Sequence, residues 1–194
     1  MNVTLDTNCI IALEKNEAEA SFVRELLSLH DSHTINVRVV AISASERKQD
    51  GTYAVGFHEF THKLAAVGLG QVEILPTLAY PGMAFPNWCY PTGGEPTSLE
   101  RNIHEILFPT TVFENRDYRT RVLNDPTSDT GDPQWRNKKC DVLVLWSHIH
   151  FHGNIFVTSD NNFRSVSKKG QLIALGAGAI LTPQEAVKTI RANI

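Results

Sequence analysis

Short apolar runs alternate along the chain with longer segments in which apolar residues recur at helical spacing. The short runs have the composition of buried strands and lie at residues 3–5, 35–42, 72–75, 155–158 and 179–181. Helices are predicted at residues 17–30, 55–67, 97–107, 141–153 and 163–169. A last helix begins at Thr182-Pro183-Gln184-Glu185, which supplies a cap, a first-turn proline and an acid. This alternation predicts an α/β fold with a mainly parallel sheet covered on both faces.

The segment from about residue 77 to residue 137 departs from this pattern. It is punctuated by prolines, contains the adjacent Gly93 and Gly94, and is rich in aromatic residues. Within it, only residues 97–107 have helical spacing. The length of 194 residues suits one domain. We therefore predict a single domain over residues 1–194, with a Pro- and aromatic-rich insertion at about 77–137.

Composition and charge exclude several classes of protein. Hydrophobic residues make up 42% of the chain and charged residues 20%, as in a globular protein that folds alone. The chain has no apolar run of membrane-spanning length and no signal-peptide pattern, so we expect a cytoplasmic protein without a membrane partner. The three cysteines are far apart and suggest neither disulfides nor a zinc site. With a net charge of -3, binding to nucleic acid must depend on a local surface.

Four acidic residues fall at positions that a parallel sheet brings to one edge. Asp6 and Asp160 each follow a predicted strand, and Glu46 and Asp141 each lie near the predicted start of a helix. Ligands of such sheets collect outside the carboxyl ends of the strands. Clustered carboxylates repel one another unless a cation lies between them, and oxygen ligands without His or Cys favour Mg²⁺ or Mn²⁺. The pattern predicts a metal site suited to hydrolysis of phosphate esters.

These residues also carry a resemblance to a known family. Leu5-Asp6-Thr7-Asn8, Ser45-Glu46, Asp141 and Val157-Thr158-Ser159-Asp160-Asn161-Asn162-Phe163 resemble the four acidic motifs of the PIN-domain ribonucleases. The resemblance covers about residues 2–76 and 138–194. It implies a three-layer α/β/α sandwich in which carboxylates bind Mg²⁺ or Mn²⁺ and a metal-activated water cleaves RNA. Many members are VapC-type toxins, so an antitoxin protein is a candidate partner.

The resemblance assigns roles to individual positions. Asp6, Glu46, Asp141 and Asp160 are the expected catalytic residues and metal ligands, with Glu59 a lesser candidate for the role of Glu46. The expected supporting groups are Asn8, Thr158 and Asn162. Asn162 stands where many members have an aspartate, so the number of bound ions, one or two, stays open. The residues expected to bind substrate phosphates are Arg164, Lys168 and Lys169.

Two other groups of residues have alternative interpretations. Aromatic residues of the insertion would form a small core, an oligomer surface or a stacking surface for RNA bases; they are Phe85, Trp88, Tyr90, Phe108, Phe113, Tyr118 and Trp135. Basic residues beside them are candidate phosphate contacts: Arg116, Arg119, Arg121, Arg136, Lys138 and Lys139. His148, His150 and His152 resemble a zinc motif, but side chains two residues apart on a helix point to different faces, which argues against zinc.

We therefore expect a metal-dependent endoribonuclease acting on RNA in the cytoplasm, with an antitoxin partner and a homo-oligomer as open possibilities. A PIN-like module that binds or assembles without catalysis is one alternative. A metal-dependent DNA nuclease or phosphatase is another, because a carboxylate cluster does not by itself distinguish RNA from DNA.

Overall fold

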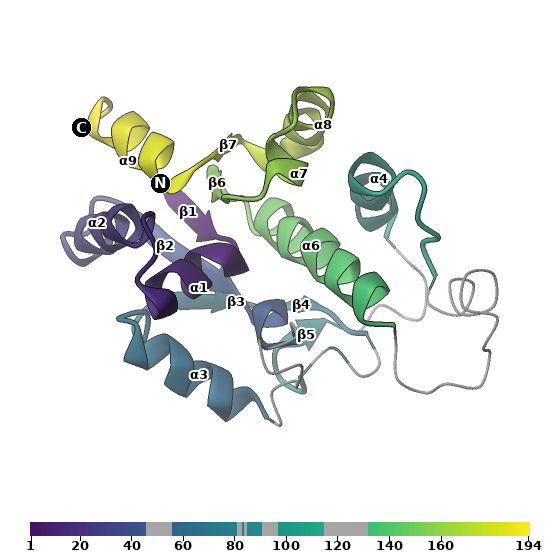
Figure 1. Cartoon of the computed structure of the whole chain (residues 1–194), viewed down its shortest axis with the longest axis horizontal. Helices are drawn as coiled ribbons and strands as arrows, with labels where there is room; N and C mark the ends of the chain where they lie inside the picture. Colours follow the sequence, from purple (N-terminus) through teal and green to yellow (C-terminus); the bar gives the residue numbers. More distant parts are fainter. Residues whose placement is uncertain (46–55, 81–82, 84, 91–96, 115–131) are drawn as a thin grey trace.

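A five-stranded parallel sheet forms the centre of the protein (Figure 1). The computed structural model describes residues 1–45, 56–80, 83, 85–90, 97–114 and 132–194. The strands, in the order in which they lie across the sheet, are β3 (Glu73–Leu75), β2 (Asn36–Val40), β1 (Asn2–Leu5), β6 (Ile155–Val157) and β7 (Ala179–Leu181). Each neighbouring pair is parallel. The first strand of the chain is therefore the central strand of the sheet.

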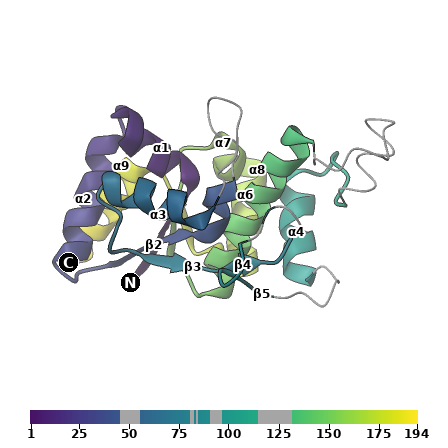
Figure 2. The same cartoon turned by 90° about the horizontal axis from the view of Figure 1, so that it is seen from below.

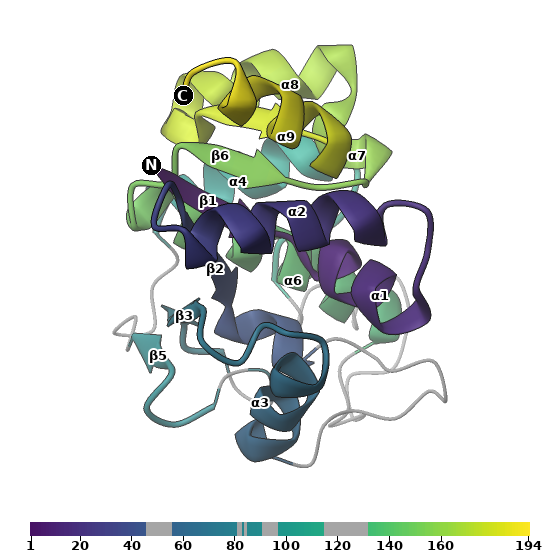
Figure 3. The same ribbon diagram turned by 90° about the vertical axis from the view of Figure 1, so that its left-hand side faces the viewer.

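Helices cover both faces of this sheet, and the predicted three-layer α/β/α architecture is confirmed. One face packs against α1 (Thr7–Lys15), α2 (Ala20–Asp31), α3 (Phe57–Ala66) and α9 (Pro183–Arg191). The other face packs against α4 (Ser98–Leu107), α6 (Pro133–His150) and α8 (Val166–Leu172). Figures 2 and 3 show α1 and α2 on one side of the strands and α4 and α6 on the opposite side.

Alternation along the strands supplies the two cores. Val3 and Leu5 of β1 lie in the core beneath α1 and α2, together with Val37 of β2. Val40 of β2 and Phe156 of β6 point to the opposite face and pack beneath α6. Residues next to each other in a strand point to opposite faces, so strands that are buried on both sides must be apolar at almost every position. This is why the predicted strands are mostly apolar, although β1 and β2 also bury the polar residues Thr4 and Arg38.

The last helix begins as the sequence predicts. The Thr182 hydroxyl accepts a hydrogen bond from the Glu185 amide (3.1 Å), and the Glu185 carboxylate accepts one from the Thr182 amide (2.9 Å). This reciprocal pair satisfies amides that would otherwise have no partner at the start of α9. The hydrogen bond from the Thr182 amide is the largest cause that lowers the pKa of the Glu185 carboxyl.

The prediction that a helix starts near Asp141 is wrong. α6 begins at Pro133, where the Asp132 carboxylate accepts hydrogen bonds from the amides of Gln134 (2.8 Å) and Trp135 (3.0 Å). An aspartate cap followed by proline in the first turn is a strong start signal, but it lies in a polar, proline-containing segment without helical periodicity. Asp141 is therefore in the middle of α6.

Several other boundaries also differ from the prediction. The helix predicted over 17–30 begins only at Ala20, and Ala41–Ser45 form a 3-10 helix at the end of the run predicted as a strand. Residues predicted as one helix over 163–169 form α7 (Asn161–Arg164) and α8, and Ile173–Ala177 follow as a π-helix. The insertion also contains a small parallel sheet of β4 (Thr77–Leu78) and β5 (Cys89–Tyr90).

Aromatic residues of the insertion contribute to both cores. Phe113 and Trp135 are buried, and Phe85 packs against the core beneath α3. Trp88 stacks on Phe57 with ring centroids 4.6 Å apart. Tyr90 differs, because 45% of it is exposed. The interpretation as core residues therefore holds for Phe85, Phe113 and Trp135, and for Phe108, which packs against the core beneath α6, while Tyr118 lies outside the described residues.

A buried ion pair fastens the insertion to the rest of the domain. Lys139 of α6 and Glu100 of α4 are 1% and 0% exposed, and Lys139 Nζ lies 3.0 Å from Glu100 Oε1. The Tyr80 hydroxyl donates to the same carboxylate oxygen (2.8 Å) and accepts from Lys139 Nζ (3.1 Å). The ammonium also lies 3.7 Å from the centroid of the Phe113 ring. Burial lowers the pKa of Lys139, while the charge of Glu100 opposes this shift.

Among the described helices, none is both long and apolar enough to cross a membrane.

The buried pair predicts a large loss of stability when one partner is removed. In Lys139→Met the Glu100 carboxylate stays buried without its cation, so we expect the free energy of unfolding in urea to fall by about 3–5 kcal/mol. Lys63→Met is the matched control, because the Lys63–Glu14 pair (2.9 Å) is 36% and 31% exposed and contributes at most about 1 kcal/mol. Equal losses in the two variants would contradict a role for the buried pair.

Candidate functional site

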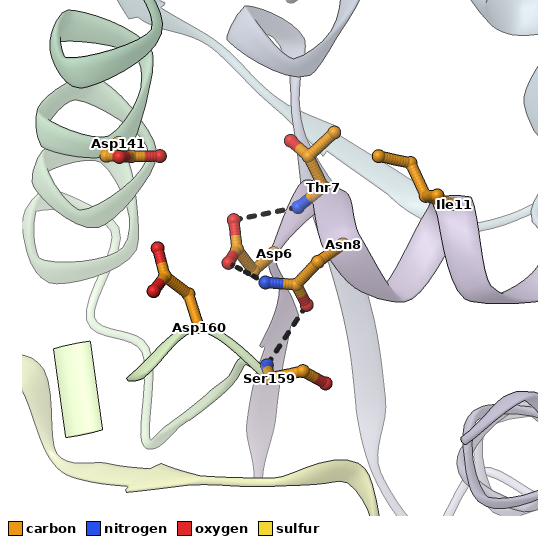
Figure 4. A pocket seen from close by; sticks show the side chains of 7 residues that line it. All are labelled: Asp6, Thr7, Asn8, Ile11, Asp141, Ser159 and Asp160. Atoms are coloured by element: carbon orange, nitrogen blue, oxygen red, sulfur yellow. Dashed lines mark hydrogen bonds between the residues drawn. The ribbon is translucent and has the colours of Figure 1, made fainter. Parts of the chain in front are cut away.

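A pocket of about 340 Å³ lies at the edge of the sheet where α1 and α7 begin (Figure 4). The described residues that line it come from the cap and first turns of α1, from the loop after β6, and from α6: Asp6, Thr7, Asn8, Ile11, Asp141, Ser159 and Asp160. Three of the four predicted acids therefore share one pocket. Figure 4 shows the carboxylates of Asp6 and Asp160 pointing into the space between α1 and α6, toward which Asp141 extends from α6.

Asp6 is a buried carboxylate at the end of the central strand. It is 4% exposed and caps α1, with Oδ1 accepting a hydrogen bond from the Thr7 amide (2.8 Å). Oδ2 accepts from Asn8 Nδ2 (2.6 Å) and from the Thr158 hydroxyl (2.6 Å). Asp6, which directly follows an apolar strand, is thus both the cap of α1 and the centre of a polar network.

Asn8 and Thr158 complete this network. Asn8 Nδ2 also donates to the Thr158 hydroxyl oxygen (3.0 Å), and Asn8 Oδ1 accepts from the Ser159 amide (3.1 Å). The Thr158 hydroxyl oxygen accepts from the Asp160 amide as well (3.0 Å). Both residues predicted as supporting groups therefore contact Asp6 and also join it to the loop that carries Asp160.

Asp160 lies in the loop after β6 and is the third residue beyond that strand, whereas Asp6 directly follows β1. It caps α7 through a hydrogen bond from the Asn162 amide to Oδ1 (2.7 Å), while Oδ2 receives no hydrogen bond from the described residues. Its charge acts on Asp6. Burial, the largest cause, and the negative charge of Asp160 raise the pKa of Asp6 to about 6, against the hydrogen bonds from Thr158, Thr7 and Asn8.

The other two predicted acids differ in how they relate to the pocket. Asp141 lines it from the middle of α6, with its side chain half-buried. Glu46 lies outside the described residues, so its role stays a prediction. The alternative, Glu59, is in the first turn of α3 and is not among the described residues that line the pocket. Among the described residues, no group of three or more Asp, Glu, His or Cys side chains is close enough together to hold a metal ion.

Two of the predicted phosphate contacts, Arg164 and Lys168, are engaged in hydrogen bonds within the fold. Arg164 Nη2 donates to Asn161 Oδ1 (2.6 Å) and to the Ser159 carbonyl (3.4 Å). Lys168 Nζ donates to the Leu107 carbonyl (2.7 Å) and to the side-chain oxygen of Asn162.

These contacts change what can be expected of two predicted residues. The side-chain oxygen of Asn162, predicted to orient a metal-bound water, already accepts from Lys168. Lys169 is half-buried in the last turn of α8. None of Arg164, Lys168 and Lys169 is among the described residues that line the pocket.

The three histidines of the predicted zinc motif lie in different environments. His148 is fully buried, with Nε2 2.9 Å from the Ala177 carbonyl oxygen, and burial lowers its pKa to about 4. His150 stacks on Trp146 with ring centroids 4.4 Å apart. His152 follows the end of α6 with a left-handed backbone (φ 53°). His148 is a core residue and His150 packs against an aromatic ring.

Sequence reasoning assigned no role to three pocket residues, Thr7, Ile11 and Ser159. Thr7 is the first residue of α1 and Ile11 lies about one turn further along. The helix that Asp6 caps therefore places both at the pocket. Ser159 stands between two residues that were assigned, and its position could have been inferred from them. The Ile11 side chain has no polar group, so nothing in the sequence distinguishes it from an ordinary core residue.

Comparison of the chain with protein-family models, with curated proteins and with solved structures finds no match. The likeness to PIN-domain ribonucleases therefore remains a resemblance of motifs. The function of the chain is therefore inferred from the chemistry of the residues that line the pocket.

The raised pKa of Asp6 predicts a specific dependence of stability on pH. The ordinary value is 3.8 and the folded value about 6, so between these pH values the folded protein binds a proton that the unfolded chain has released. The contribution of Asp6 to stability is therefore full below about pH 4 and is lost as the pH rises through about 6, a change of about 3 kcal/mol.

Urea unfolding of the metal-free wild type and of Asp6→Asn at several pH values checks this. We expect the stability of the wild type relative to Asp6→Asn to decline from pH 4 to pH 7. Asp31→Asn, at an exposed position on α2, is the control: the stability of the wild type relative to Asp31→Asn should not decline over this pH range. A wild type that gains stability relative to Asp6→Asn over this range would show that the folded protein favours the ionised form of Asp6.

Proposed function

We propose that this chain is a metal-dependent endoribonuclease of the cytoplasm. The observation that carries the proposal is the pocket at the carboxyl edge of the sheet, where Asp6, Asp141 and Asp160 come together from three distant parts of the chain. Two neighbouring acids, one of them buried with a raised pKa, are an unfavourable arrangement that a bound cation relieves.

The residues of the pocket fit a hard divalent cation in their chemistry. The ionisable side chains among the described lining residues are all carboxylates, the ligands that Mg²⁺ and Mn²⁺ prefer. Mg²⁺ commonly keeps several waters and is held by one or two carboxylates, so a closed cage of three acids is not required. Asp6 and Asp160 would hold the ion, with Asp141 on the other side of the pocket. When bound, such an ion would activate a water for attack on phosphorus and stabilise charge on the phosphate.

The chain's own residues prepare this site. Thr158 and Asn8 direct their donors at Oδ2 of Asp6, which fixes the carboxylate and favours its ionised form. Asp160 keeps Oδ2 available because its helix cap uses Oδ1. Position 162 is an amide and not an acid, and its side-chain oxygen already accepts from Lys168, so it adds no acidic ligand. These features favour a site with one ion.

RNA is the proposed substrate because of the motif resemblance. Lys169, Arg164 and Lys168 lie close in sequence to Asp160 and are the proposed phosphate contacts. An antitoxin protein and a second copy of the chain are the proposed partners.

A second candidate is a binding or assembly module with the same fold and no catalysis. It is favoured by one observation, that in the described residues no three candidate ligands enclose an ion. The two functions differ in a measurable way, because a module without a metal site has no Mn²⁺ affinity that depends on Asp6.

The test is cleavage of single-stranded RNA and of DNA with the same base sequence, with Mn²⁺ or with a chelator. We expect the wild type to cleave RNA with Mn²⁺, and Asp6→Asn or Asp160→Asn to lower this rate by about 100-fold or more because each removes a ligand charge. Asp31→Asn should keep wild-type activity, and circular dichroism should show all three variants folded.

Each contrary result has a distinct meaning. Full activity in a folded Asp6→Asn/Asp160→Asn variant would end the assignment. Cleavage of DNA at the same rate would keep the metal site and remove the preference for RNA. Mn²⁺ binding without cleavage of either polymer would favour the module.

A further inference from the structure

Ser159 is hydrogen-bonded through all of its polar groups, although it belongs to a short loop at the pocket. Its amide donates to Asn8 Oδ1 (3.1 Å), its hydroxyl donates to Glu19 Oε2, and its carbonyl accepts from Arg164 Nη2 (3.4 Å). These contacts come from α1, from the start of α2 and from α7. The residue between Thr158 and Asp160 is thus held from three directions.

Glu19 stands directly before α2, where a side chain commonly caps the helix. Its carboxylate caps no amide of α2 and instead reaches Ser159, which is 140 residues away in sequence. An acid at the start of a helix is favoured by the helix dipole wherever its side chain points. Helix formation therefore explains the presence of Glu19, but it does not explain the contact with Ser159.

We propose that Glu19 is a positioning residue of the pocket: by holding the Ser159 hydroxyl it fixes the loop that presents Asp160 opposite Asp6. Its consequence for metal binding rests on the proposed function. Asp160 has only two attachments of its own in the described residues, the bond from its amide to Thr158 and the cap to Asn162. The Asp160 carboxylate therefore depends on the conformation of the preceding residue.

The charge of Glu19 belongs to the same neighbourhood. It is the third cause, after burial and the charge of Asp6, that raises the pKa of the Cys9 thiol, and Cys9 is the residue after Asn8. The carboxylate of Glu19 therefore lies close enough to the residues of α1 beside the pocket for its charge to act on one of them.

Two variants separate positioning from direct ligation. Glu19→Ala removes the acceptor for the Ser159 hydroxyl, whereas Glu19→Gln keeps an acceptor oxygen and removes only the charge. A positioning residue is largely rescued by glutamine, while a ligand is not. Ser159→Ala removes the same hydrogen bond from the other side, so Glu19→Ala/Ser159→Ala should be no more impaired than either single variant.

The first measurement needs no metal. Backbone amide hydrogen exchange of the metal-free protein should show faster exchange at Ser159 and Asp160 in Glu19→Ala and in Ser159→Ala, with near wild-type exchange in Glu19→Gln. Glu17→Ala is the matched control, because Glu17 is exposed and its ion pair among the described residues is with Lys15, at 3.7 Å. Unchanged exchange in Glu19→Ala would overturn the inference whatever the protein binds.

The second measurement is calorimetric titration with Mn²⁺. Partners that orient a metal ligand typically change affinity by about 10- to 100-fold, so we expect Glu19→Ala to bind at least about 10-fold more weakly, and Glu19→Gln and Glu17→Ala to stay near the wild type. Wild-type binding that depends on Asp160 but not on Glu19 would overturn the positioning role and leave the proposed function intact. If the wild type binds no Mn²⁺ while Glu19→Ala speeds amide exchange in the loop, the proposed function is wrong and the role of Glu19 in holding Ser159 is supported.

Discussion

The site depends on the hydrogen bond between the Thr158 hydroxyl and the buried carboxylate of Asp6. It joins the ends of two neighbouring strands whose register pairs Leu5 with Val157. A carboxylate in this place is costly to bury, and the donors from Thr158, Thr7 and Asn8 offset only part of that cost, which is why its pKa is raised. The remaining cost is the physical reason to expect a positive partner in the pocket.

Around this bond the structure builds a rigid frame from local elements. Helix α1 starts on Asp6 and α7 starts on Asp160, so the two acids are fixed by the same caps that begin their helices. Capping and function do not compete here, because each cap uses one carboxylate oxygen. The loop between β6 and α7 is short and is tied to α1 and α2, and we propose that Glu19 holds it in place.

The insertion is coupled to the frame by charged side chains on two helices. Lys139, two residues before Asp141 on α6, pairs with Glu100 of α4, and Lys168 of α8 donates to the last carbonyl of α4 and to Asn162. A displacement of α4 would therefore act on α6 and on the segment that follows Asp160. The helix α4 of the insertion is thus a packed part of the domain.

The sequence by itself determined the strands, most helices and the two principal acids. Short apolar runs favour strands buried on both faces, and Thr182 with Glu185 is a strong helix start, because these signals act over a few residues. The tertiary structure decided what depends on contacts across the chain. These features are the placement of Asp141 in the middle of a long helix, the hydrogen bond between Ser159 and Glu19, and the hydrogen bond between Lys168 and Asn162. A single side chain carries no record of which distant partner it will meet, since that is set by how the sheet brings strand ends and helix starts together.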